Sequence, residues 1–422
     1  METYEFDGVT INLNKKGSQE YSKVSYPIRY GVFNEIVTKE YNFQFNLNGE
    51  IKFIQGRRDN WPNPVEWLKR TVTNDWVYYL TGAYSTVYDL IGEYYIPCFL
   101  YPSNSIFGGN PFEHSGVKNA IDSFEKLSLY LKEKTSSSLP STVKNFFSKI
   151  EINDDSSLKL KAYKFLSMIG GRITVLPPDA RHVDYDVIPL IIADGCLYNC
   201  GFCRVKSGQV YSTRVKNNIL FQINQLKEFY NDDIKNYNSL FLGTHDALNA
   251  GEELIEYASL EAYKRFNFKE SYIKGANLFL FGSVDSLLNS KNSLFQKLNS
   301  MPFNTYVNIG LESADALTLQ EIQKPITHKM VIDAFEKILD INRTYNKLEI
   351  TSNFIIGANL GDKHFSATLK LLRDKMPHFY SKGAAYFSPL HENGTKKEII
   401  EKFEHIKKLS RLPAYIYIIQ RL

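Results

Sequence analysis

From about Val187 onward, short apolar runs alternate with longer segments in which apolar residues recur every three or four positions. The runs predict strands at 187–193, 239–243, 277–282, 305–310, 350–357 and 384–389. Spacing near 3.6 predicts helices at 214–230, 252–265, 286–298, 314–323 and 329–341. Nearly continuous apolar strands are typical of a parallel sheet that helices cover on both faces. The pattern therefore predicts six βα units, fewer than the eight of a closed barrel.

The chain before this region has a different pattern. Residues 41–55 alternate between apolar and polar around Asn48-Gly49, which predicts a β-hairpin. The run Trp61-Pro-Asn-Pro predicts the start of a helix that continues through 67–70, because proline suits a first helical turn. Further helices are expected at 118–132 and 158–168, and the polar, proline-containing run 134–142 is interpreted as a linker.

These patterns divide the chain into three parts. We expect an α+β domain over 1–183 that binds substrate or a partner, a βα domain over 184–395, and a helix and strand over 396–422. A hydrophobic content of 43% and a charged content of 23% in 422 residues are typical of a globular protein. The net charge of +4 neither requires nor excludes a nucleic-acid partner. The sequence shows no transmembrane segment and no secretory signal at its start.

Three of the four cysteines, Cys196, Cys200 and Cys203, fall within eight residues in the spacing C-x3-C-x2-C. They follow directly after the first predicted strand, and in αβ barrels functional groups gather at the carboxyl ends of strands. A structural zinc site completed by His182, Asp194 or His245 is compatible with this loop. Zinc sites usually pair two C-x2-C knuckles, however, and no second knuckle exists here. Iron–sulfur ligation is therefore favoured over zinc, and a disulfide scaffold is less favoured still.

The cysteine spacing, with an aromatic residue before the last cysteine, resembles the cluster loop of the radical S-adenosylmethionine (SAM) superfamily. The resemblance implies a partial (β/α)6 TIM-like barrel of the radical SAM type, preceded by an α+β N-terminal domain. It implies an oxygen-sensitive [4Fe–4S] cluster on the three cysteines, with SAM bound at the iron that lacks a thiolate. An external one-electron reductant of the flavodoxin or ferredoxin type would then drive SAM cleavage to a 5′-deoxyadenosyl radical that abstracts a hydrogen atom from substrate. Such a cluster favours the reducing cytoplasm.

The resemblance also places SAM contacts at the ends of later strands. Phe202 is expected beside the adenine, with loop packing as the alternative. Gly243 and Thr244 match the position of the glycine-rich motif that orients the methionine ammonium, although the common Gly-Gly-Glu form is absent. His245, next in the chain, is equally compatible with a core position, a ligand contact or a proton donor.

Three further strand ends carry the remaining expected contacts. Ser283 is placed near the ribose or methionine of SAM, with helix capping as its alternative. The stretch Gly310-Leu-Glu312-Ser, followed by Lys324-Pro, resembles that of relatives of oxygen-independent coproporphyrinogen oxidase. It implies that Glu312 accepts hydrogen bonds from the ribose and that Lys324 pairs with the SAM carboxylate, whereas a surface ion pair is the alternative. Asn353 is expected on the adenosine side or as a buried core amide.

The substrate is less defined by the sequence. No second cysteine cluster follows the barrel, which argues against peptide modifiers with auxiliary clusters, and a small metabolite or peptidyl group is expected. Cys98 is interpreted as a small buried residue rather than a hydrogen-atom donor. An RNA-modifying radical SAM enzyme is compatible but not favoured, because glutamates interleave with the lysines of 396–411. A non-enzymatic zinc or iron–sulfur protein is the third alternative.

Overall fold

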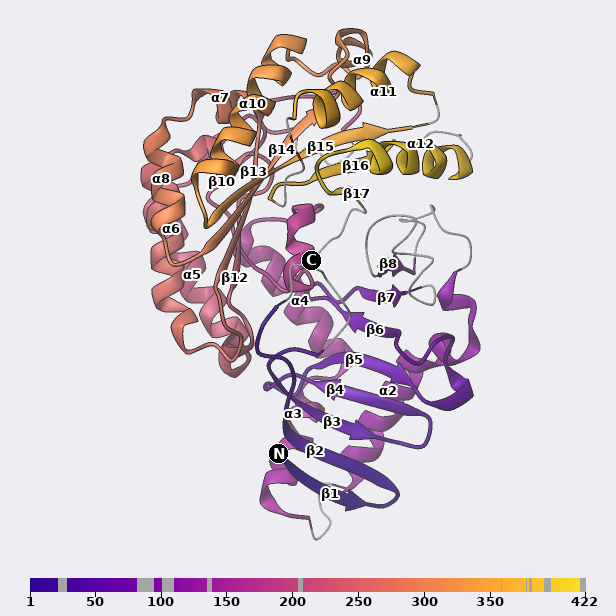
Figure 1. Ribbon diagram of the computed structural model, residues 1–422. Helices are drawn as coiled ribbons and strands as arrows, with labels where there is room; N and C mark the ends of the chain where they lie inside the picture. The colour runs from indigo at the N-terminus through magenta and orange to yellow at the C-terminus, as the bar shows by residue number, and fades with distance from the viewer. Residues whose placement is uncertain are drawn as a thin grey trace.

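The fold, given by a computed structural model, is built on two large sheets that lie one above the other in Figure 1. The structure describes residues 1–21, 29–81, 95–100, 110–134, 139–203, 208–357, 359–376, 378, 382–390 and 396–417. An eight-stranded antiparallel sheet comes first in the chain, and a seven-stranded parallel sheet follows. The predicted fold class, a partial barrel after an α+β region, is confirmed.

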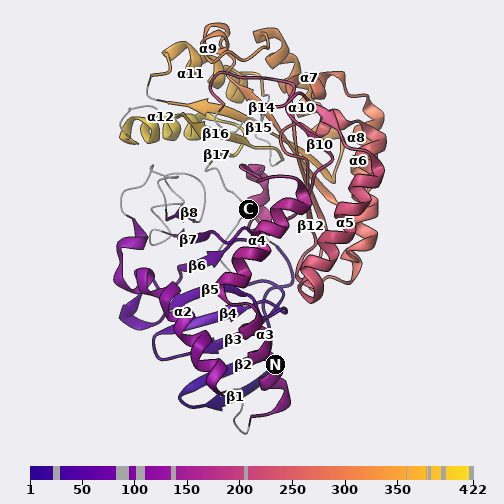
Figure 2. The ribbon, with the colours of Figure 1, turned by 180° about the vertical axis from the view of Figure 1, so that it is seen from behind.

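The antiparallel sheet is formed by strands that pair in chain order. They are β1 (Glu2–Phe6), β2 (Val9–Lys16), β3 (Val32–Val37), β4 (Tyr41–Phe45), β5 (Ile51–Gly56), β6 (Trp67–Arg70), β7 (Trp76–Leu80) and β8 (Ile96–Phe99). The predicted hairpin is confirmed, because β4 and β5 pair on either side of Asn48-Gly49. Helices α2 (Ser115–Lys134) and α3 (Ser141–Ile152) cover one face, as Figure 2 shows, and share an apolar core with it.

The helix predicted to start at Trp61 is wrong, because residues 67–70 form strand β6 instead. The indole N–H of Trp61 donates to the Glu66 carbonyl at 2.7 Å, and Glu66 N–H donates to the Asn63 carbonyl at 3.0 Å. These bonds close a turn that delivers the chain to the sheet between β5 and β7. The expected helices at 118–132 and 158–168 are found within α2 and α4 (Asp155–Ile169). The predicted linker lies partly outside the described residues and leads into α3, which the sequence reading missed.

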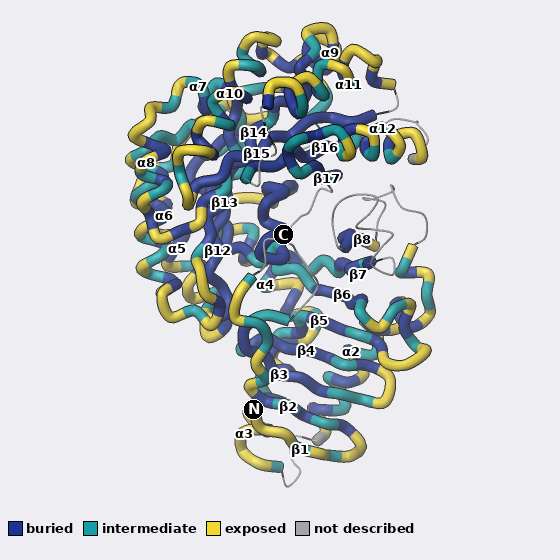
Figure 3. The backbone as a smooth tube through the Cα atoms, viewed as in Figure 1, coloured by how far each residue is buried: buried dark blue, intermediate teal, exposed yellow. Residues whose placement is uncertain are grey.

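The parallel sheet contains all six predicted strands and one more. In spatial order it runs β17 (Ala414–Ile416), β16 (Ala385–Pro389), β15 (Leu348–Ile356), β14 (Asn304–Glu312), β13 (Asn277–Gly282), β12 (Ser239–Leu242) and β9 (Ile188–Leu190). Every residue of β12 and β15 is buried, including the polar side chains Thr351, Ser352 and Asn353 of β15. Figure 3 shows these buried strands beneath helices with exposed outer surfaces. Within the described chain, β9 and β17 are the edges and do not pair with each other.

Helices follow the strands as the sequence pattern predicts. They are α5 (Lys216–Tyr230), α6 (Glu252–Arg265), α7 (Val284–Asn289), α8 (Asn292–Ser300), α9 (Ala316–Glu321), α10 (His328–Thr344), α11 (Asp362–Leu369) and α12 (Lys396–Leu409). The single helix predicted at 286–298 is divided into α7 and α8, because Ser290 and Lys291 adopt extended backbone angles. No helix in the described part of the chain combines the length and apolar character that crossing a bilayer requires.

The division into 1–183, 184–395 and 396–422 stays a prediction. Two contacts qualify how separate these parts are. Strand β17 lies in the expected C-terminal part and pairs with β16 of the expected barrel domain. Residues Phe165, Ile169 and Leu176, from the expected first domain, share the apolar core of the parallel sheet.

A short 3-10 helix, η3 (Pro178–Val183), supplies polar side chains to the inner face of the parallel sheet. Asp179 is 1% exposed and accepts hydrogen bonds from the Thr351 hydroxyl at 2.6 Å and the Tyr386 hydroxyl at 2.8 Å. The Nε of Arg181 donates to the same Tyr386 hydroxyl at 3.0 Å. Burial raises the pKa of Asp179 to about 6. The segment that precedes the barrel therefore fills part of its interior.

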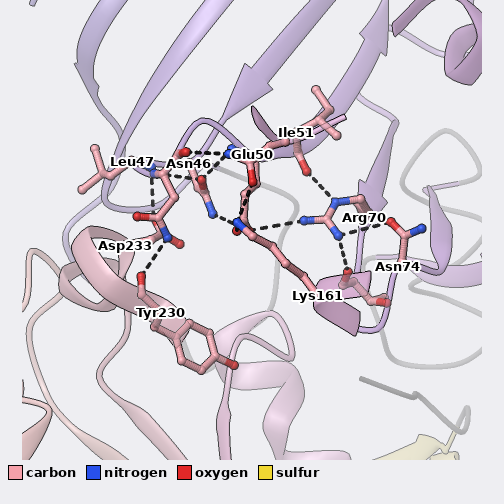
Figure 4. A network of polar contacts seen from close by, with 12 residues as sticks. Asn46, Leu47, Glu50, Ile51, Arg70, Asn74, Lys161, Tyr230 and Asp233 are labelled. Carbon is pink, nitrogen blue, oxygen red and sulfur yellow. Dashed lines mark hydrogen bonds and ion pairs between the residues drawn. The ribbon is translucent and has the colours of Figure 1, made fainter. Parts of the chain in front are cut away.

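Charged side chains join the antiparallel sheet to the parallel one (Figure 4). Lys161 on α4 contacts Glu50 at 2.7 Å, and Arg70 on β6 contacts the same carboxylate at 3.5 Å. Asp233, in the 3-10 helix η4 (Asn231–Asn236), accepts a hydrogen bond from the Leu47 N–H at 3.3 Å. Glu50, Arg70 and Asp233 line a partly open cavity. Polar contacts therefore contribute to this boundary between the two sheets.

We expect Asp233→Asn to reduce the pH dependence of folding. Burial raises the pKa of Asp233 to about 6 from an ordinary value of 3.8. The stabilising contribution of its protonated form is complete below the lower value and is lost as pH rises through the higher one. The stability of the natural protein relative to the variant should fall by about 1–3 kcal/mol between about pH 4 and pH 7.

Urea denaturation across this pH range measures the difference, with Asp232→Asn as the control. Asp232 is the exposed neighbour, and its side chain contacts only Lys149 among the described residues. Equal pH slopes for the natural protein and Asp233→Asn would contradict the prediction.

Candidate metal and cofactor site

Cys196, Cys200 and Cys203 lie on a loop that begins at strand β10 (Ala193–Asp194), just beyond the carboxyl end of β9. Strand β10 pairs with β11 (Ser212–Thr213), so the two ends of the loop are held side by side. Arg214 donates to both carboxylate oxygens of Asp194, at 2.7 and 2.6 Å. Bidentate pairs of this kind fix orientation as well as contributing energy. The base of the loop is therefore rigidly placed at the edge of the sheet.

The three thiols lie on the same loop but differ in burial. Cys200 is 6% exposed, whereas Cys196 and Cys203 are half-buried. Burial raises the pKa of the Cys196 thiol, and raises that of Cys200 to about 11, while the charge of Lys324 opposes both shifts. The charges of neighbouring cysteines raise these two pKa values as well.

No three His, Cys, Asp or Glu side chains converge as a finished metal site among the residues that the structure describes. Residues 204–207, which directly follow Cys203, are not among them. The chemistry of the donor set, three sulfur atoms from one loop, nevertheless fits an iron–sulfur cluster. Cys196, Cys200 and Cys203 are the residues that would hold it.

Two of the residues considered as a fourth zinc ligand have other partners. Asp194 is held by Arg214 at the base of the loop. The Nε2 of His182 lies 3.9 Å from Asp179 Oδ1, and its ring lies 5.1 Å from that of Tyr306 inside the barrel. The third, His245, is half-buried after β12, and burial lowers its pKa. The structure therefore gives the zinc alternative no support from His182 or Asp194.

Glu312 and Lys324, predicted from one motif, form a buried ion pair. Lys324 Nζ lies 3.1 Å from Glu312 Oε1, with side-chain exposures of 5% and 11%. Glu312 adopts a φ of 63°, in the left-handed region, where the pairing of β14 with β15 shifts register. A Cβ on Gly310 would lie 2.4 Å from that same Oε1, so a larger residue there would displace the carboxylate. Lys324 also lies 5.3 Å from the centre of the Tyr198 ring, next to the cysteine loop.

The end of β12 presents oxygen atoms that the protein itself does not use. Thr244 Oγ1 and Asp246 Oδ2 are buried and have no hydrogen-bond partner in the described part of the chain. The other carboxylate oxygen of Asp246 accepts from the Ser283 N–H at 2.9 Å and the Ser286 hydroxyl at 2.8 Å. Gly243 allows the chain to turn into this site, with a φ of 77°. Buried polar atoms without partners are costly, so these oxygens fit the polar groups of a ligand.

Ser283 has the capping role that the sequence reading kept as an alternative. Its hydroxyl accepts the Ser286 N–H at 3.0 Å, and the two serines form a capping box at the start of α7. Its predicted contact with SAM stays a prediction. Phe202 is half-buried and packs against the core of the parallel sheet, so its predicted contact with adenine also stays a prediction.

Asn353 on β15 completes a chain of buried hydrogen bonds. Its Nδ2 donates to Asn308 Oδ1 at 2.6 Å, and Asn308 Nδ2 donates to the Thr351 hydroxyl at 2.9 Å. That hydroxyl donates in turn to Asp179. The Oδ1 of Asn353 is buried and has no partner among the described residues. This network fixes the amide so that a free acceptor remains for a ligand.

The sequence reading missed several residues that position this site. Tyr198, on the cysteine loop, donates its hydroxyl hydrogen to Asp285 and accepts the Asp285 N–H at 3.0 Å. Asp246 and Asn308 stood within motifs that were recognised, yet neither was assigned a role. A carboxylate just beyond a predicted strand was the available signal for Asp246. The bond between Tyr198 and Asp285 joins distant parts of the chain, so no local pattern indicated it.

Comparison with known proteins identifies this part of the chain. Residues 190–372 match the profile of the radical SAM superfamily. They form a radical SAM domain. The superfamily uses a [4Fe–4S] cluster and SAM. The matched segment spans strand ends of β9, β12, β13, β14 and β15, where the features described above lie.

Individual relatives of the radical SAM domain are more distant. A probable threonylcarbamoyladenosine tRNA methylthiotransferase of Methanocaldococcus jannaschii is 23% identical over 241 residues, which are 54% of this chain and 53% of that protein. The chain thus spans about half the length of this curated relative.

Among solved structures, a radical SAM methyltransferase from Sphaerobacter thermophilus has 15% identity, a TM-score of 0.35, and coverage of 55% of this chain and 66% of its own. Streptococcus suis SuiB has 10% identity, a TM-score of 0.38, and coverage of 90% and 72%. With such low TM-scores, the superfamily match is the observation that assigns the domain.

Thr244 and Thr351 provide a matched test of the free oxygen atoms. We expect Thr244→Val to lower the affinity for SAM about tenfold without loss of stability, because its buried hydroxyl has no partner among the described residues. Thr351→Val should instead cost roughly 1–3 kcal/mol of stability, because it removes the bonds to Asp179 and Asn308.

Equilibrium dialysis with SAM and chemical denaturation measure the two effects on cluster-loaded protein. A loss of stability in Thr244→Val as large as that in Thr351→Val would show that the Thr244 hydroxyl is a structural group.

Proposed function

We propose that this protein is a radical SAM enzyme whose cluster is held by Cys196, Cys200 and Cys203. The observation that carries the proposal is that three thiols follow β9 while buried oxygens without partners among the described residues lie after β12 and on β15. When bound and reduced by an external flavodoxin- or ferredoxin-type donor, the cluster and SAM supply a 5′-deoxyadenosyl radical and methionine. The substrate that this radical chemistry would act on is a small metabolite or a peptidyl group.

The residues around the cysteines would bind and orient SAM. Thr244, Asp246 and Asn353 offer oxygen atoms that suit the donors of a methionine ammonium or ribose hydroxyls. Lys324 provides a cation near the cysteine loop, and Glu312 holds that cation in place. Because the side chains of this pair are largely buried, their electrostatic effect on a bound ligand is only weakly screened.

Two contacts hold the cysteine loop in place, which suits a site where reactive groups must be kept in position. Arg214 fixes its base through Asp194, and Tyr198 ties its middle to the start of α7. Pre-organised positions of this kind reduce the reorganisation needed when a ligand binds. We propose a cytoplasmic location, because thiolate ligands of an oxygen-sensitive cluster require a reducing compartment.

Replacing Cys196, Cys200 or Cys203 by alanine is expected to abolish SAM cleavage, because each change removes one sulfur ligand. Anaerobically reconstituted protein is mixed with SAM and dithionite, and 5′-deoxyadenosine is measured together with iron content and visible absorption. Cys98→Ala is the matched control. Cys98 lies on β8 of the antiparallel sheet, and burial raises the pKa of its thiol to about 12.

We expect Cys98→Ala to retain the cluster and the cleavage activity. Formation of 5′-deoxyadenosine at the natural rate in all three alanine variants would overturn the proposal. Stoichiometric zinc without visible absorption in the natural protein would instead support the third alternative, a structural zinc protein.

An RNA substrate is the second candidate, favoured by one observation. The curated relative is described as a tRNA methylthiotransferase, although it is only 23% identical to this chain. Lysines and glutamates interleave on α12, where Lys408 contacts Glu404 at 2.7 Å, which gives this helix little net positive charge. We therefore retain the small-metabolite or peptidyl substrate as the first candidate.

If RNA is the substrate, affinity for tRNA should fall steeply as salt concentration rises, because binding releases counterions. Filter binding at several salt concentrations measures this slope. Absence of tRNA binding even at low salt would remove the RNA candidate and leave the radical SAM assignment untouched.

A further inference from the structure

Arg29 is a half-buried cation whose guanidinium has no anionic or hydrogen-bonding partner among the described residues. Its Nε and Nη1 atoms are shielded from solvent, and neither has an acceptor. Burial lowers the pKa of Arg29 to about 9, although Glu35 and Asp184 act in the opposite direction from a distance. An unpaired buried charge is costly, and a guanidinium remains protonated near neutral pH. An acceptor from outside the described residues would offset this cost.

The protein holds Arg29 in a defined position. Its guanidinium carbon lies 3.6 Å from the centre of the Trp67 ring and 4.4 Å from that of Phe53. The two rings meet edge to face, with centroids 6.0 Å apart. Stacking on aromatic rings stabilises a cation but leaves the edge of the guanidinium, where its N–H groups point, available for an acceptor.

Arg29 lines a small, partly open cavity together with Tyr21 and Gln44. The Tyr21 hydroxyl and the Gln44 Oε1 are also buried without partners in the described chain. The amide orientation of Gln44 is set, because its Nε2 donates to Glu35 at 2.9 Å. The cavity therefore contains unfilled donors on Arg29 and an unfilled acceptor on Gln44, with the Tyr21 hydroxyl able to do either.

The other charges near this cavity are already paired. Lys52 and Asp186, which also line it, contact each other at 3.2 Å. Glu35 contacts Lys15 at 2.7 Å, and accepts from Gln44 as well. Arg29 is therefore the charge that a ligand would have to neutralise.

The cavity lies away from the cysteine loop. Asp186 and Asn236, two of its lining residues, precede strands β9 and β12, whereas the cysteines follow β9. In a parallel sheet all strands begin at one end of the sheet and finish at the other. A ligand here is thus separate from the SAM site and from the proposed radical step.

We propose that the cavity of Tyr21, Arg29 and Gln44 binds a ligand with a carboxylate next to an N–H group. The carboxylate pairs with the Arg29 guanidinium, and the N–H donates to Gln44 Oε1. A free amino acid and the carboxyl end of a peptide share this chemistry. Inorganic phosphate would satisfy Arg29 but offers no nitrogen donor for Gln44.

Four probes separate these cases: glycine, N-acetylglycine, acetate and inorganic phosphate. Binding to the full-length protein is measured by ligand-observed NMR and by the shift in unfolding temperature. We expect saturable binding of glycine or N-acetylglycine, and weaker binding of acetate. Preference for glycine indicates a free amino acid, and preference for N-acetylglycine indicates a peptide end. No binding of any probe, or binding of phosphate alone, would overturn the proposal.

Variants test the assigned contacts. Arg29→Gln should weaken binding about ten- to a hundredfold, the effect of losing charge-assisted hydrogen bonds. Arg58→Gln, which removes an exposed arginine from the same domain, should leave binding unchanged. If Arg29→Gln fails to fold, Arg29→Lys keeps the charge but loses the guanidinium fork, and should still weaken binding. Unchanged affinity in a folded Arg29 variant would show that this residue only clamps the aromatic rings.

Discussion

The arrangement of the site depends on how the open parallel sheet satisfies its buried polar interior. Because the two edge strands of this sheet do not pair, the barrel is open. The inward hydroxyl and amide groups of its strands therefore need hydrogen-bond partners from other segments of the chain. Asp179, from the segment that precedes the first strand, accepts hydrogen bonds from Thr351 and Tyr386. It thus links the neighbouring strands β15 and β16. The chain of bonds from Thr351 through Asn308 to Asn353 extends this support toward the carboxyl ends of the strands. The buried polar side chains and those toward the carboxyl ends of the strands therefore belong to one hydrogen-bond network.

The cysteine loop has a second, independent means of support. Its base is an ion pair between neighbouring strands, and its middle is tied to α7 through Tyr198. The buried pair of Glu312 and Lys324 lies beside the loop, with Lys324 over the ring of Tyr198. Replacing one partner of a buried ion pair leaves an uncompensated charge, whereas the intact pair adds little net stability. The pair therefore indicates where the two side chains are held rather than how stable the protein is.

Sequence reasoning succeeded where the physical signal is local. The parallel strands were predictable because burial on both faces requires continuous apolar runs, and the cysteine motif because its ligands are adjacent in the chain. The segment after Trp61 was misassigned because a side chain to backbone bond, from Trp61 to Glu66, closes a turn where proline suggested a helix. The roles of Asp179 and Tyr198 depend on contacts across long stretches of chain, as does the isolation of Arg29. No spacing rule reports such contacts.

The order of strands in the parallel sheet has a consequence for how the molecule folds. Every strand of this sheet pairs with the next strand of the same sheet along the chain, so each pairing closes only the segment between the two strands. Pairing successive strands keeps the contact order lower than pairing the first strand with the last would. The oxygen atoms proposed to bind SAM come from the segment after β12 and from β15, and the cysteines follow β9. The proposed pocket is therefore complete only once the strands from β9 to β15 have all paired.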